Sequence, residues 1–242
     1  MAISLDNVFW HALSGHQAGC AVGTPHARRY APGFSPIIAF ADRSQPRFDE
    51  LAPFCEPGEH LYCDGWTGPV PAGWHIETQA HMDKMRWSGP PPDQDEAPEA
   101  QPILPAHLPL VLELTALTHP GPFGPRTPEL GAYFGLFENG RLMAMAGERA
   151  HAGSWREISG VCTHPDFQGR GLAKRLMRKL IRQQMQRQET PFLHVMCDNV
   201  AAHTMYLRMG FEVQQTSVVR VVSRRPFPAA PMGGGAMTLH RV

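Results

Sequence analysis

The chain has 242 residues, enough for two small domains that each bury a core. Lysine plus arginine and aspartate plus glutamate number 22 each, so no global field points to nucleic acid, a membrane surface or a polyionic partner. No segment approaches the roughly 18 apolar residues of a membrane helix, and no apolar run of signal-peptide length opens the chain. The cationic residues are almost all arginine, and Ala, Pro and Gly are abundant, which we interpret as bacterial composition bias. We expect a soluble cytoplasmic protein.

Cysteine and histidine usage gives no sign of a metal or of a disulfide framework. The five cysteines are odd in number and show no C-x-x-C spacing, so reduced thiols are expected. The 13 histidines form no H-x-x-x-H pattern on a predicted helix. We therefore predict a protein without a structural or catalytic metal.

A proline- and acid-rich stretch at 88–106 separates two parts of the chain, and its composition favours an extended linker. Before it, in 1–87, short strand-like runs at 35–41, 60–63 and 74–78 and one helix at 47–54 predict an α+β half. After it, residues 107–242 are predicted to form a second domain. Its expected elements are a helix at 108–117, a rigid loop at 120–125, a hairpin of strands 132–137 and 142–147, a strand at 157–163, a helix at 172–188, a strand at 192–196, a helix at 200–209 and a final strand pair ending near 222.

The most informative segment is the glycine-bearing turn Gln168-Gly169-Arg170-Gly171-Leu172-Ala173, which lies between a predicted strand and an amphipathic helix. Glycines let the backbone approach a phosphate, and the first-turn NH groups of a helix have no intrahelical partners. A pyrophosphate would fit such a turn. Residues 141–190 also carry ten basic residues against four acidic ones, which would favour a phosphorylated ligand. Simple solvation of the basic helix face remains the alternative.

The segment resembles the cofactor signature Q/R-x-x-G-x-G/A of the GNAT acetyltransferase superfamily, matched by Gln168, Gly171 and Ala173. The resemblance extends through "EISGVCTHPDFQGRGLAKRLM" and "CDNVAAHTMYLRMGFEV" and covers about 108–222. It implies an α/β fold of three layers, with a mixed, splayed sheet flanked by helices. The N-terminal half lacks the signature, and we interpret it as a degenerate copy of the same fold.

The resemblance also implies roles for individual residues. The backbone of Val161, Cys162 and Thr163 would lie along the pantetheine arm of acetyl-CoA, with the NH of Val161 facing the thioester carbonyl. Asn199 would hydrogen-bond the pantetheine or phosphate portion, and Tyr206 would act as general acid toward the departing sulfur. The residues implied in pyrophosphate binding are Gln168, Gly169, Arg170, Gly171, Leu172, Ala173 and Lys174.

Glu157 is the candidate general base, because it shares a strand face with Val161 and a free glutamate titrates near 4.3. The alternative is an exposed strand residue without a role. Tyr206 has an alternative as a core aromatic, and Cys162, on the opposite face from Glu157, is expected to be a buried structural thiol. His164 and His203 flank the cofactor site, where packing is the more ordinary role.

These inferences predict an N-acetyltransferase in which a primary amine of a small molecule or protein attacks acetyl-CoA directly in a ternary complex. The protein would be a monomer or homodimer. The main alternative is a non-catalytic acyl-CoA sensor or regulatory module, which would bind the cofactor without turnover. A nucleic-acid-binding protein that uses the basic helix is disfavoured by the zero net charge.

Overall fold

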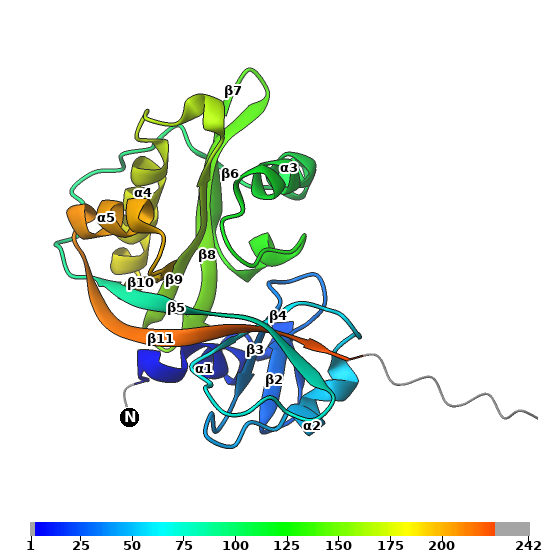
Figure 1. The fold of residues 1–242 in the computed structure, drawn as a ribbon. Helices are drawn as coiled ribbons and strands as arrows, with labels where there is room; N and C mark the ends of the chain where they lie inside the picture. The colour runs from blue at the N-terminus through cyan, green and yellow to red at the C-terminus, as the bar shows by residue number, and fades with distance from the viewer. Residues whose placement is uncertain (1–2, 226–242) are drawn as a thin grey trace, which may run out of the picture.

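The computed structural model describes residues 3–225, which build one mixed sheet flanked by helices (Figure 1). The helices are α1 (Val8–Ser14), α2 (Phe48–Leu51), α3 (Leu108–Thr118), α4 (Leu172–Gln186) and α5 (Val200–Met209). The strands are β1 (Ala21–Gly23), β2 (Ala27–Tyr30), β3 (Ile37–Phe40), β4 (Leu61–Asp64), β5 (Trp74–Trp87), β6 (Gln101–Pro102), β7 (Tyr133–Glu138), β8 (Arg141–Ala152), β9 (Trp155–Thr163), β10 (Thr190–Met196) and β11 (Phe211–Arg224).

The order of the strands joins the two halves of the chain. It runs β1-β2-β3-β4-β11-β5-β10-β9-β8-β7-β6, so β5 from the N-terminal half lies between two C-terminal strands. β5 and β11 are 14 residues each and pair antiparallel over most of their length, with Ala80 opposite Val219. The proposed division into 1–87, 88–106 and 107–242 remains a prediction, and the sheet itself is continuous through both parts.

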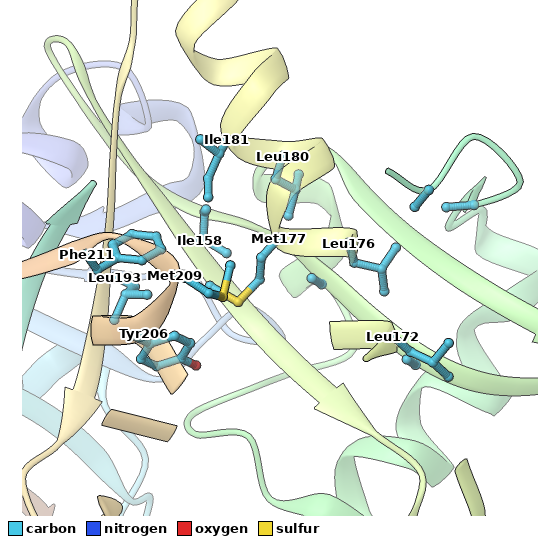
Figure 2. Packing of buried hydrophobic residues seen from close by; sticks show 14 of the residues in the cluster. Ile158, Leu172, Leu176, Met177, Leu180, Ile181, Leu193, Tyr206, Met209 and Phe211 are labelled. Carbon is cyan, nitrogen blue, oxygen red and sulfur yellow. The ribbon is translucent and has the colours of Figure 1, made fainter. Parts of the chain in front are cut away.

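Helices cover both faces of the C-terminal strands. α4 and α5 pack on one face and α3 on the other (Figure 1). The larger core lies under α4 and α5, where Leu176, Met177 and Leu180 belong to the same buried cluster as Ile158 and Phe211 (Figure 2). These α4 residues recur at helical spacing and are fully buried, so α4 is fixed mainly by apolar packing.

Local signals predicted most C-terminal elements correctly. The hairpin turn between β7 and β8 is formed by Asn139 and Gly140, both with positive φ (50° and 78°), which these two residue types tolerate best. The helices predicted at 108–117 and 200–209 are α3 and α5, and the predicted 172–188 helix is α4 with its end at Gln186.

Several predictions of secondary structure were wrong. The final strand pair is one long strand, β11, because its bulge between Val213 and Gln215 bends the strand without reversing it. The strand predicted at 74–78 continues to Trp87, and the helix predicted at 47–54 is α2 followed by a 3₁₀ turn. α1, β1 and β2 were not predicted.

Residues 88–106 pack against α4. Ala97 and Ala100 are buried in the main core, and the acidic side chains beside them face the basic side of the helix. The ion pairs are Arg175 with Glu99, Arg178 with Glu96 and Lys179 with Asp95, at 2.5, 2.6 and 2.5 Å. Much of the positive charge of α4 is therefore neutralised by this segment and does not face a ligand.

Candidate active site

A cleft opens where the parallel strands β9 and β10 separate. They pair only from Thr190 opposite Trp155 to Phe192 opposite Glu157, although both strands continue beyond that point. The resulting cleft has a volume of about 280 Å³ and is lined by both strands, by α5 and by the 118–122 loop. The predicted splay of the sheet is confirmed, and the cleft exposes strand backbone on its β9 side.

A β-bulge shapes the β9 side of this cleft. Met145 pairs with Cys162 and Gly147 with Ser159, so Gly160 and Val161 together oppose the single β8 residue between them. Gly160 has a φ of +62°, and an added Cβ would lie 3.0 Å from the ring of Tyr133. A glycine is therefore required there, and the bulge turns the backbone at Val161 toward the cleft.

The glycine turn before α4 lines a hollow of its own, of about 640 Å³. Gly169 and Gly171 have φ values of +76° and +71°, and a Cβ on either would meet nothing within 4 Å, so the backbone is open to a ligand. Gly171 is the N-cap of α4 and supplies no side-chain cap, which leaves first-turn NH groups available to an anion. Lys174 and Arg208 line this hollow, and neither forms an ion pair within residues 3–225.

The other residues implied in pyrophosphate binding divide into two groups. Gln168, Leu172 and Ala173 line the hollow, as does Thr163 at the end of β9. Arg170 does not line it, because its guanidinium donates to Glu138 at 3.2 Å and lies over the ring of Phe167. Arg208 was not predicted, since nothing in the sequence brings α5 close to the start of α4.

Glu157 lies in the wall of the cleft and is fully buried. Its carboxylate accepts hydrogen bonds from Arg149 Nε at 2.9 Å, Arg149 Nη2 at 2.5 Å and the NH of Ala150 at 3.1 Å. Although burial opposes ionisation, Arg149 and His194 hold the pKa of Glu157 far below its ordinary value. This carboxylate is a poor proton acceptor, which favours a positioning role for Glu157.

His194 on β10 has the geometry of a base held by that carboxylate. Its Nδ1 lies 2.6 Å from Glu157 Oε1, and because a carboxylate only accepts, the proton of the neutral ring belongs on Nδ1. Nε2 then carries the lone pair. The ring is 4 % exposed and lines the cleft, and Nε2 has no hydrogen-bond partner in the described part of the chain. A buried polar atom without a partner beside a cleft points to a ligand group.

His194 and Arg149 were not predicted as site residues. Period-two alternation places residues 192, 194 and 196 on one face of β10, so the sequence could have predicted His194 as a neighbour of Glu157 across the parallel pair. The sequence could not have predicted the distance between the two side chains, because that distance depends on where the two strands separate.

Tyr206 and Asn199 enter the same cleft from α5. Tyr206 is 8 % exposed and packs edge-on against Phe211, so it is also part of the core (Figure 2). Burial raises the pKa of its phenol to about 12, which keeps the hydroxyl protonated. The side-chain oxygen of Asn199 accepts from the NH of Ala202 and caps α5.

The remaining candidates flank the cleft. Cys162 faces α3, is buried, and has a thiol pKa raised to about 11 by that burial, as expected of a structural cysteine. His203 is bound to Asp83 at 2.9 Å, and His164 packs on Phe167. No cluster of three potential metal ligands occurs between residues 3 and 225. Over the same stretch, no helix is both long and apolar enough to cross a membrane.

Comparison with known proteins gives the family. Residues 133–221 match the family of FR47-like proteins. A solved structure from Novosphingobium aromaticivorans, assigned to the GNAT acetyltransferases, is 30% identical, with a TM-score of 0.83 over 92% of this chain and 99% of that one. The chain belongs to the GNAT acetyltransferase family.

More distant structures share the fold. A GCN5-related N-acetyltransferase-like protein from Streptococcus suis is 17% identical, with a TM-score of 0.58 over 90% of this chain and 92% of that one. A GCN5-related N-acetyltransferase from Kribbella flavida is 15% identical, with a TM-score of 0.57 over 91% and 96%. The search of curated proteins gave no match.

Proposed function

We propose that this protein transfers the acetyl group of acetyl-CoA to a primary amine by direct attack in a ternary complex. The observation that carries the proposal is a single cleft that brings together the β9 bulge, the His194–Glu157 pair and Tyr206, next to the glycine turn of α4. Acetyl-CoA supplies the activated acetyl thioester. The residues of the chain bind acetyl-CoA, orient the amine, and accept or donate the protons of the reaction.

The binding residues fit an elongated, phosphorylated donor. The NH groups at the start of α4, with Lys174 and Arg208, match a pyrophosphate, and the hollow they line lies beside the end of β9. The bulged backbone at Val161 provides a strand edge for the pantetheine amides, and its NH would stabilise charge that develops on the thioester oxygen. The amide nitrogen of Asn199 is a further donor toward the same arm.

His194 takes the proton of the amine at Nε2, and Glu157 holds the ring in the required tautomer and stabilises the imidazolium that forms. In this proposal His194 takes the base role that was predicted for Glu157. Tyr206 donates a hydrogen bond to the departing sulfur. Since its pKa of about 12 is well above the roughly 8.5 of a free thiol, hydrogen bonding contributes more than complete proton transfer.

A charge placed in the glycine turn tests the proposal. Ala173→Glu puts a carboxylate in the first turn of α4, where it suits the helix dipole and should not unfold the protein, but it would repel a pyrophosphate. Wild type should melt at a higher temperature in acetyl-CoA and release CoA when amines are added. Ala173→Glu should lose at least tenfold in acetyl-CoA affinity, whereas Gln183→Glu, with the same charge nearer the other end of α4, should not.

Two results would count against the proposal. Equal affinities of the two variants would show that the turn does not hold the pyrophosphate. Tight acetyl-CoA binding by wild type without acetyl transfer to any amine would favour the alternative, a sensor or regulatory module.

A further inference from the structure

A second hollow, of about 410 Å³, opens off the cleft on the side of the N-terminal half. Phe9 of α1, Ile37 of β3 and Tyr62 of β4 line it, so residues far from the GNAT signature shape it. The cleft and the second hollow share the following lining residues: Met82, Gly121, Pro122, Arg149 and Met196. A molecule bound in the second hollow therefore has direct access to the cleft that holds His194.

The floor of the second hollow is apolar and comes from the central strand pair. Ala80 of β5 lies opposite Val219 of β11, and Thr78 lies opposite Val221, and all four side chains face the hollow. The lining is mostly carbon. A hollow of this size and character fits the apolar body of a small molecule.

The charges around this hollow are paired, with one exception. Asp64 is bound by Lys84 at 2.6 Å and accepts from Ser217 at 2.6 Å, while Lys84 is fully buried and also donates to two backbone carbonyls. Arg149 is committed to Glu157. Asp198 is exposed and lines the hollow, and it has no ion pair in the described part of the chain.

We infer that the second hollow binds the acetyl acceptor and that this acceptor is a small primary monoamine with an apolar body and no second charge; the inference rests on the proposed function. Among the described residues around the hollow, Asp198 is the one unpaired carboxylate, and it attracts the single ammonium group as the acceptor enters, before the amine reaches His194 and loses its proton. A second ammonium, as in a polyamine, or a carboxylate, as in a free amino acid, would lie unpaired against the apolar floor, which is unfavourable. The N-terminal half therefore shapes the acceptor specificity together with Asp198, Val219 and Val221.

The test uses the full chain and two variants of adjacent β5 residues. Ala80→Phe fills the hollow, while His81→Phe adds a phenyl ring at an exposed neighbouring position that does not line it. CoA release is measured with phenethylamine, hexylamine, spermidine, lysine and a short peptide with a free N-terminus. The acetyl-CoA-induced shift in melting temperature is measured in parallel as a readout of the donor site.

We expect phenethylamine or hexylamine to have the highest kcat/KM, and Ala80→Phe to lower it at least tenfold while His81→Phe leaves it unchanged. All three proteins should show the same acetyl-CoA shift. If Ala80→Phe loses that shift through misfolding, Ala80→Leu, which adds less volume, takes its place with the same expectation.

The outcomes separate the two proposals. A retained acetyl-CoA shift with preference for spermidine, lysine or the peptide, or with no transfer to either apolar monoamine, overturns the acceptor class and leaves the donor site intact. Equal losses of kcat/KM in Ala80→Phe and His81→Phe overturn the placement of the acceptor in the second hollow. Absence of any acetyl-CoA shift in wild type overturns the proposed function and the inference with it.

Discussion

Replacing His194 with glutamine removes the proposed proton acceptor and keeps a polar side chain of similar size. Loss of a general base typically lowers the rate by about 10² to 10⁴. A primary amine with a pKa near 10.4 is neutral in only about one molecule in a thousand at pH 7.4. Without His194, only the neutral fraction of the amine can react, so we expect kcat/KM to fall by about 10² to 10³ at neutral pH.

The pH dependence distinguishes a base from a structural residue. In His194→Gln, each unit of added pH raises the neutral amine about tenfold, so log kcat/KM should rise with a slope near one until the pKa of the amine is reached. Wild type should rise less steeply above neutrality, and the two curves should converge at high pH.

The assay is CoA release from acetyl-CoA with a saturable amine between pH 6 and 10. His203→Gln is the matched control, because that ring is bound to Asp83 and does not line the cleft. The control should follow the wild-type curve. A loss in His194→Gln that is the same at every pH would mean that His194 only packs the site, and an unchanged rate would remove it from the mechanism.

Two further predictions concern the other side chains of the cleft. Tyr206→Phe removes one hydroxyl and little volume, so kcat should fall about 10²-fold while KM for acetyl-CoA barely changes; a wild-type rate under conditions where chemistry is limiting would contradict this. Glu157→Gln leaves Arg149 without its buried carboxylate and should lower the free energy of unfolding by about 3 to 5 kcal/mol in urea titrations at pH 7. Because the pKa of Glu157 is lowered on folding, its contribution to stability is complete above about pH 4.3 and is lost as the pH falls. The free energy of unfolding of the variant should therefore fall less steeply with acid than that of wild type. Identical slopes of the free energy of unfolding against pH would refute the lowered pKa of Glu157.

The C-terminal elements were predictable because their signals are local. Asn139 and Gly140 carry the hairpin turn, and Asn199 caps α5 where that helix was predicted to begin. The glycines before α4 are needed at positive φ, and the sequence pattern shows them directly. Each of these features depends on residues within a few positions of one another.

Features that depend on distant pairing were not predictable. The basic face of α4 was read as a source of positive charge, but acids about 80 residues earlier neutralise most of it. Glu157 was predicted to share a strand face with Val161 and to lie opposite Cys162, but the bulge at Gly160 and Val161 reverses the alternation and puts Glu157 on the face of Cys162. Its role follows from Arg149 and His194, whose approach depends on the register of three strands. The insertion of β5 between β10 and β11 has no local signature.

That insertion has a consequence for how the chain folds. Arg220 of β11 and its partner Gln79 of β5 lie 141 residues apart, so their pairing closes a very long loop. Synthesis delivers β5 long before β11, and until β11 leaves the ribosome, β5 lacks its longest neighbour. Contacts of such long range slow folding, and an unpaired strand edge of this length invites association with other chains. The strand pair that forms the floor of the second hollow therefore makes folding of the nascent chain dependent on the synthesis of β11.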